Sequence, residues 1–151
     1  PPLGLLSLAG AVGNDHNVKI IDLVAQNYNN LQLKSEFNKC ELVGINCLHD
    51  SIVRASQICQ IATDCGAYTV VGGIHASLAP EIIRINTLYF LIRGEGEITF
   101  RELVEALDKW KSLKNIDGLT YWDDNSNKPH HNKNRKLIEN LDDLPAHMQM
   151  D

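Results

Sequence analysis

Residues 42–73 read LVGINCLHDSIVRASQICQIATDCGAYTVVGG, and this stretch decides the fold class. It opens on an apolar run at Leu42–Asn46, which predicts a strand. Ile52–Asp64 follows with apolar residues at helical spacing. Tyr68–Val71 predicts a second strand, which ends at Gly72-Gly73. A strand, a helix and a strand in this order predict a parallel β-α-β unit.

The same alternation of strands and helices continues on both sides of this stretch. Because the strands are apolar nearly throughout, we expect a parallel sheet with helices on both faces, in an α/β, flavodoxin-like (Rossmann-like) fold. The further predicted elements are a helix from Pro2 to Gly13, a strand at Val18–Leu23, a weak helix at Leu31–Phe37, a short helix at Pro80–Ile85, a strand at Leu88–Ile92, and a helix through Leu107 with Thr99 and Glu102 as a capping box.

The first predicted helix has no strand before it. In the flavodoxin-like strand order 2-1-3-4-5 the first strand is central, so we expect that the first strand is missing and that the chain is a piece of a longer protein. The pattern changes after Trp110. We expect an α/β domain over residues 1–115, and a strand, a turn and a linker over residues 116–151.

Composition excludes several classes of function. The chain has 151 residues and a net charge of −5, which argues against general nucleic-acid binding because such binding depends on clustered Lys and Arg. No apolar run approaches the roughly 20 residues that span a bilayer, so we expect no membrane segment. The four cysteines show no C-x-x-C spacing, which favours a reduced, cytoplasmic protein without a metal site.

Three loops carry the candidate binding residues, because ligands of open parallel sheets bind beyond the carboxyl ends of the strands. Glycines in such loops let the backbone approach a large flat ligand, since no Cβ intervenes. The same glycines are also compatible with tight turns that bind nothing. The candidates are Cys47, Leu48 and His49 in the first loop, Gly72, Gly73 and His75 in the second, and Arg93, Gly94, Glu95, Gly96 and Glu97 in the third.

The order of several segments resembles the cobalamin-binding domains of radical S-adenosylmethionine (SAM) enzymes, the family that includes the anaerobic magnesium-protoporphyrin monomethyl ester cyclase type and several methylases. The similar segments are Pro1–Ala9, Val43–Ile45, Val70–Ala76, Arg93–Glu97, and Ile116–Tyr121 followed by Leu141–Pro145.

The resemblance implies that the three loops line the corrin and nucleotide tail of cobalamin, with no catalytic residue in this chain. It also implies a partner domain of the same parent chain, with a [4Fe–4S] cluster and SAM. Two family motifs are absent from this sequence: Asp-x-His-x-x-Gly, which supplies a cobalt-ligating histidine, and Cys-x-x-x-Cys-x-x-Cys, which holds the cluster. We therefore expect that this chain alone cannot cleave SAM.

Two other functions remain open. One is a cofactor-free scaffold domain of the same family. The other is a receiver-type signalling domain, for which Asp50 lies near the phosphoryl-accepting position while Arg93 replaces the required lysine. Without its central first strand the sheet would have a gap or close up and leave an unpaired edge, so we also expect self-association or a distorted sheet, and weak cobalamin binding by the chain alone.

Overall fold

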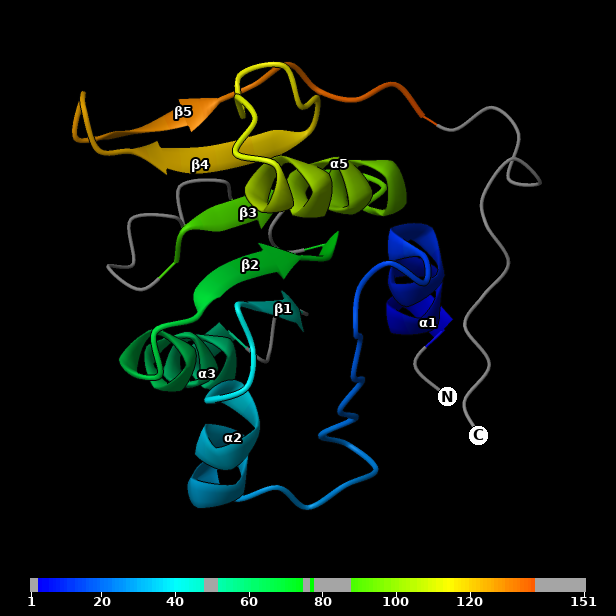
Figure 1. Cartoon of the computed structure of the whole chain (residues 1–151), viewed down its shortest axis with the longest axis vertical. Coiled ribbons are helices and arrows are strands. Elements are labelled where there is room, and N and C mark those ends of the chain that lie inside the picture. Colours follow the sequence, from blue (N-terminus) through cyan, green and yellow to red (C-terminus); the bar gives the residue numbers. More distant parts are fainter. Residues whose placement is uncertain (1–2, 48–51, 75–76, 78–87, 138–151) are drawn as a thin grey trace.

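The computed structural model describes residues 3–47, 52–74, 77 and 88–137. No helix in these ranges is long and apolar enough to cross a membrane. The helix predicted at Pro80–Ile85 lies outside the described residues. The elements are α1 (Leu3–Val12), α2 (Asn30–Phe37), β1 (Leu42–Asn46), α3 (Ile52–Asp64), β2 (Tyr68–Gly72), β3 (Phe90–Ile92), α5 (Glu97–Asp108), β4 (Leu119–Asp123) and β5 (Lys128–His131) (Figure 1).

The strands form one sheet in the order β1-β2-β3-β4-β5. β1, β2 and β3 are parallel, with Asn46 opposite Gly72 and Val71 opposite Leu91. β4 runs antiparallel to β3, and β5 runs antiparallel to β4. The parallel part of the sheet is therefore confirmed, and the antiparallel strands β4 and β5 both lie after residue 115, where a strand and a turn were expected as an extension. The tight turn between β4 and β5 reverses the chain, as a short connection between neighbouring strands must.

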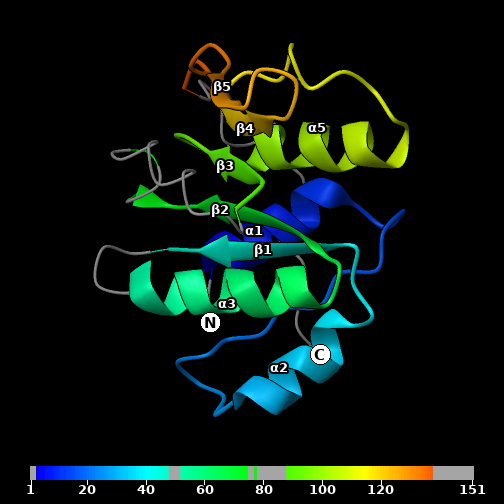
Figure 2. The same ribbon diagram turned by 90° about the vertical axis from the view of Figure 1, so that its left-hand side faces the viewer.

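Helices cover both faces of the sheet, as predicted. Successive residues of a strand point to opposite faces. In β2, Val71 packs against Ala55 and Cys59 of α3, while its neighbour Val70 packs against Leu103 of α5. Figure 2 shows α3 and α5 on opposite sides of the strands. α1 packs on α5 rather than on α3.

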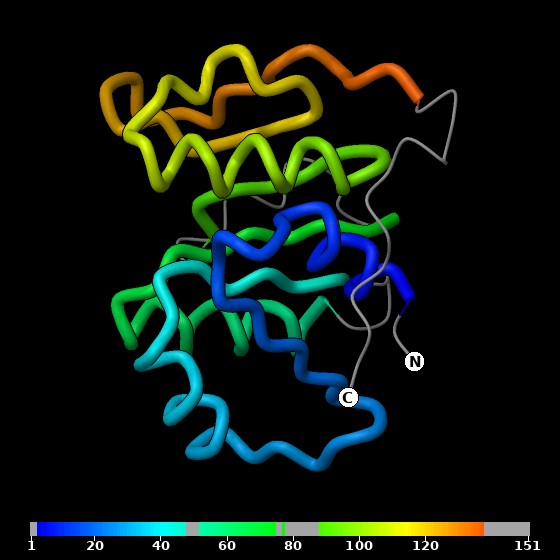
Figure 3. The backbone as a smooth tube through the Cα atoms, turned by 45° about the vertical axis from the view of Figure 1, so that its right-hand side comes forward, coloured from blue at the N-terminus to red at the C-terminus, as the bar shows by residue number. Residues whose placement is uncertain are grey.

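The strand predicted at 18–23 is wrong. This segment has irregular backbone and belongs to the connection from α1 to α2, which Figure 3 follows as a continuous tube. Its polar side chains have other partners: Lys19 Nζ lies 2.8 Å from Glu36 Oε1 of α2, and Asp22 Oδ1 accepts the N–H of Val24 at 3.0 Å. Ile21 packs against the cluster of α2 and α3 residues. An apolar run becomes a strand only with a neighbouring strand to pair with, and the described residues offer this one none.

The capping box also lies elsewhere than predicted. α5 begins at Glu97 with Gly96 as its N-cap, so Thr99 is the third helical residue. The capping box in the structure is that of α2, where the Gln32 N–H donates to Asn29 Oδ1 and the Asn29 N–H donates to Gln32 Oε1, both at 2.9 Å.

Candidate functional site

The carboxyl ends of the three parallel strands meet at one edge of the sheet, and the three candidate loops begin there. The register places Asn46 beside Gly72 and Val71 beside Leu91, so the loops after β1, β2 and β3 are neighbours. Leu48, His49, Asp50 and His75 lie outside the described residues. The described candidates in these loops are Cys47, Gly72, Gly73, Arg93, Gly94, Glu95, Gly96 and Glu97.

In the first loop, Cys47 points into the core rather than toward a ligand. It is 0% exposed and packs with Ala55, Cys59 and Leu91. Its N–H donates to the carbonyl oxygen of Gly72 at 2.9 Å and so continues the β1–β2 ladder by one residue. Burial raises the pKa of the neighbouring Cys59 thiol to about 11, which keeps it protonated at neutral pH. Neither thiol is placed to act as a nucleophile at this edge.

The second loop depends on Gly73, which has a φ of +107°. A Cβ on this glycine would lie 2.6 Å from Asn46 Oδ1 and 2.7 Å from the Cys47 carbonyl oxygen. The missing side chain therefore makes room for the first loop. At Gly72 a Cβ would meet only Ile92 Cβ, at 3.8 Å.

Ser77 joins the second loop to the third, a role that sequence reasoning missed. Its Oγ donates to the Gly73 carbonyl oxygen at 3.2 Å and accepts the Gly94 N–H at 2.8 Å. The first contact has a sequence signal, because a serine four residues after a loop glycine can bond back to its carbonyl across one helical turn. The contact with Gly94 spans 17 residues and has no local signal.

The third loop contains two charged candidates with structural partners. The Arg93 guanidinium donates to Asn134 Oδ1 at 2.6 Å and to the carbonyl oxygens of Leu119 and Asn132. Burial lowers the pKa of Arg93. Because these partners lie in β4 and after β5, Arg93 links the third loop to the extension formed by residues 116–137.

Glu97, at the start of α5, holds α1 against that helix. Its Oε1 accepts the Ser7 hydroxyl at 3.1 Å, and Ser7 is buried in the contact between α1 and α5. Gly96 belongs to the same contact, since a Cβ there would lie 3.3 Å from Leu8 Cδ2. Glu95 is half-buried. Gly96 and Glu97 therefore hold α5, the helix that follows the third loop, against α1.

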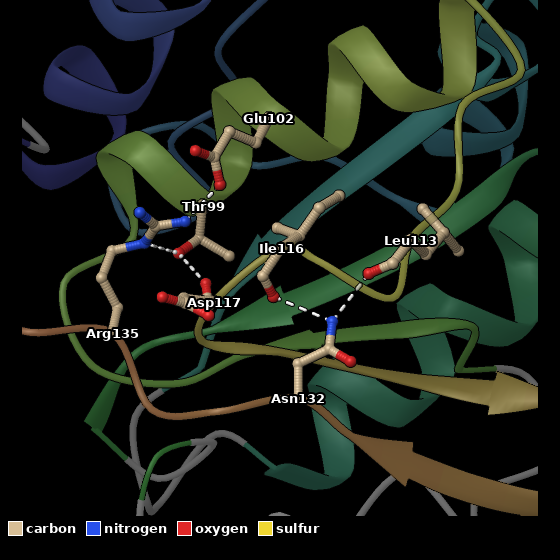
Figure 4. Close-up of polar contacts among 7 residues, drawn as sticks. All are labelled: Thr99, Glu102, Leu113, Ile116, Asp117, Asn132 and Arg135. Carbon is tan, nitrogen blue, oxygen red and sulfur yellow. Dashed lines mark hydrogen bonds and ion pairs between the residues drawn. The ribbon is translucent and has the colours of Figure 1, made fainter.

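Residues from the connection before β4 and from the segment after β5 brace the first turn of α5, as Figure 4 shows. Thr99 Oγ1 donates to the Asp117 carbonyl oxygen at 2.9 Å and accepts the Nε–H of Arg135 at 2.8 Å. Arg135 also forms an ion pair with Glu102. Thr99 is completely buried, so the Arg135 guanidinium reaches in to satisfy a hydroxyl that water cannot reach.

Asn132 makes a second set of contacts that hold residues 116–137 in place. Its Nδ2 donates to the carbonyl oxygens of Leu113 at 2.7 Å and Ile116 at 2.9 Å (Figure 4). These contacts hold the connection from α5 to β4 against the end of β5. The segment from 116 to 137 thus packs on the third loop and α5 from the side opposite β2.

Among the described residues at this edge, apolar side chains and bare backbone are exposed. Ile74 is 69% exposed in the second loop, and Val53 is 70% exposed in the first turn of α3. Gly94 has a φ of +74°, and a Cβ there would meet nothing within 4 Å. In the described part of the chain, no group of three His, Cys, Asp or Glu side chains could hold a metal ion. The described part of this edge suits the binding of a large, partly apolar ligand.

Comparisons with known proteins identify the family to which the chain belongs. The family model of the B12 binding domain matches residues 1–104. An uncharacterised methyltransferase of Pyrococcus horikoshii is 36% identical over 96% of this chain, and an uncharacterised methyltransferase of Synechocystis is 31% identical over 72% of it. The chain spans only 32% and 20% of these two relatives.

Solved structures share the fold. The radical SAM methyltransferase TsrM of Kitasatospora setae, solved with cobalamin and a [4Fe–4S] cluster, matches 97% of this chain and 28% of its own, with a TM-score of 0.77 and 20% identity. The cobalamin-dependent SAM radical enzyme OxsB, solved with aqua-cobalamin and SAM, matches 91% of this chain and 20% of its own, with a TM-score of 0.76 and 21% identity. With the family model matching most of its length, the chain belongs to the B12-binding domain family.

Proposed function

We propose that this chain is the cobalamin-holding part of a longer cobalamin-dependent radical SAM enzyme, and that cobalamin lies across the loops after β1, β2 and β3. One observation carries the proposal: three neighbouring parallel strands end at one edge, in loops that expose Ile74 and the bare backbone of Gly94. Ligands of open α/β sheets bind at this edge.

The residues at this edge fit a corrin. The macrocycle is large and flat, with an apolar ring and a polar amide rim. Ile74 and Val53 offer apolar surface to the ring, and loop backbone offers hydrogen-bonding groups to the rim. Bound cobalamin supplies methyl-group or radical chemistry, while this chain binds it, orients it and shields it from water.

We propose methyl transfer, rather than radical cyclisation, as the reaction of the parent protein. Both curated relatives are named as methyltransferases, and so is TsrM. Because the chain spans only 32% and 20% of those relatives, we propose that the cluster and SAM are held by another part of the same parent. In the described structure Cys40, Cys47, Cys59 and Cys65 form no disulfide bond, which supports a reducing, cytoplasmic compartment.

Titration of the chain with aqua-cobalamin tests the proposal. We expect a weak but saturable change in the visible spectrum with one cobalamin per chain. The absence of any spectral change at high protein concentration would favour the cofactor-free scaffold. Phosphorylation of the chain by acetyl phosphate would favour the receiver-type domain.

We also propose that the outer edge of β1 pairs with a second copy of this chain. Within the described ranges, no strand pairs with β1 on the side away from β2. The Glu41 carbonyl and Cys47 N–H face β2, so the backbone groups of Leu42, Gly44 and Asn46 face the open edge. The opposite edge of the sheet is protected differently, since β5 carries Lys128 and Pro129.

Light scattering across a range of protein concentrations should therefore show reversible association. Gly44→Lys should weaken it, because a lysine on an edge strand opposes pairing. A Cβ on Gly44 makes only ordinary contacts, at 3.7 Å or more, so the variant should keep its fold. Ser126→Lys, in the exposed turn between β4 and β5, is a control of equal charge. A monomer at every concentration, or equal association of the two variants, would contradict pairing through β1.

A further inference from the structure

Ser77 is placed to set the distance between the second and third loops. The sheet fixes the spacing of β2 and β3 only as far as their paired residues, of which Val71 and Leu91 are the last. Beyond that point the chains turn away at Gly73 and Gly94, both at positive φ. The Ser77 Oγ lies between them and bonds to both backbones.

The Ser77 hydroxyl accepts one hydrogen bond and donates the other. The Gly94 N–H donates to Oγ at 2.8 Å, and the hydroxyl donates to the Gly73 carbonyl oxygen at 3.2 Å. That carbonyl also accepts the Ser77 N–H at 3.2 Å, so both the backbone and the side chain of the serine bond to Gly73. One hydroxyl therefore acts as both donor and acceptor in a link between two adjacent loops.

We propose that the Ser77 hydroxyl is a positioning group for cobalamin, which holds the Gly72–Gly73 and Gly94 backbones at the separation that the corrin requires. This inference rests on the proposed function. Loops already held in the binding arrangement lose less conformational freedom when the ligand binds, so they bind it more tightly. Without the hydroxyl, the Gly94 N–H and the Gly73 carbonyl lose their common partner and the loops can move apart.

Ser77→Ala should raise the Kd for aqua-cobalamin about ten-fold, the change that the loss of two partly exposed hydrogen bonds would produce. Ser77→Thr keeps the hydroxyl and should stay within about two-fold of the original chain. Ser77→Cys keeps the size of the side chain but bonds weakly, so its Kd should fall between the two.

The experiment is a visible-spectrum titration of the full 151-residue chain and its variants with aqua-cobalamin, at a temperature where circular dichroism shows each to be folded. Ser112→Ala is the matched control, because among the described residues the Ser112 hydroxyl has one partner, the Lys114 N–H in a surface turn. Amide hydrogen exchange at Gly94 gives a second readout that does not involve cobalamin. It should quicken in Ser77→Ala and remain slow in Ser77→Thr and Ser112→Ala.

The possible outcomes separate the inference from the proposed function. If the original chain binds cobalamin and Ser77→Ala binds it equally well, the positioning role is wrong and the proposed function stands. If Ser77→Ala lowers the melting temperature without changing Kd, the hydroxyl serves stability alone and the inference also fails. If the original chain binds no cobalamin, the proposed function fails and the positioning inference fails with it. Amide exchange at Gly94 still reports whether Ser77 links the two loops.

Discussion

Gly73→Ala should destabilise the chain by about 3 kcal/mol or more and remove measurable cobalamin binding. The residue has a φ of +107°, which L-amino acids rarely adopt, and its new Cβ would lie 2.7 Å from the Cys47 carbonyl oxygen. That contact is with backbone, so it cannot be relieved by a side-chain rotation. The first loop must move away from the second, and the edge where we place cobalamin loses its shape.

Gly94→Ala is the matched control for this effect. Gly94 also has a positive φ, of +74°, but a Cβ there would meet nothing within 4 Å. It should therefore cost only the backbone strain of about 1–2 kcal/mol. Urea unfolding followed by circular dichroism measures both variants. Equal losses of stability would show that backbone strain alone, and not contact with the first loop, explains the need for glycine at 73.

Leu119→Ala should lower the free energy of unfolding by about 3 kcal/mol, within the range for a buried leucine. Leu119 is 0% exposed in β4 and belongs to the same cluster as Phe90 and Ile92 of β3 and Leu103 of α5. We propose on this basis that residues 116–137 fold with residues 3–115 as one cooperative unit, although the family model ends at 104.

Leu137→Ala provides the control, because Leu137 is 76% exposed and should change stability by less than about 0.5 kcal/mol. Thermal unfolding should show a single transition in both variants. A separate early transition in Leu119→Ala, with the rest of the chain unfolding at the original temperature, would mean that the extension folds independently of the α/β layers.

Apolar patterns in the sequence were sufficient to predict the bounds of some helices and strands. The apolar spacing of Ile52–Asp64 predicts α3 with the bounds that the structure has, and Leu42–Asn46 likewise predicts β1. Val18–Leu23 has an equally apolar pattern and forms no strand. The difference is the neighbour: β1 pairs with β2, whereas Ile21 packs against α2 and α3. A pattern of side chains reports burial but does not report which backbone is available for pairing.

The prediction that Thr99 caps its helix is wrong for a similar reason. Its hydroxyl was expected to bond within its own helix, but it bonds to Asp117 and Arg135, which come from the connection before β4 and the segment after β5. A capping pattern in the sequence describes what a side chain can do locally. It does not describe the more distant groups that compete for the same hydroxyl.

The sequence by itself determined the parallel strands, the helices on both faces and the edge at which three loops meet, because strand and helix periods and the carboxyl-end rule follow from local chemistry. Only the tertiary structure decided what the described loop residues do. It buries Cys47, turns Arg93 toward Asn134, packs Gly73 against the first loop and brings Ser77 to Gly94. These roles depend on contacts between residues distant in sequence, and such contacts exist only once the strands have come together.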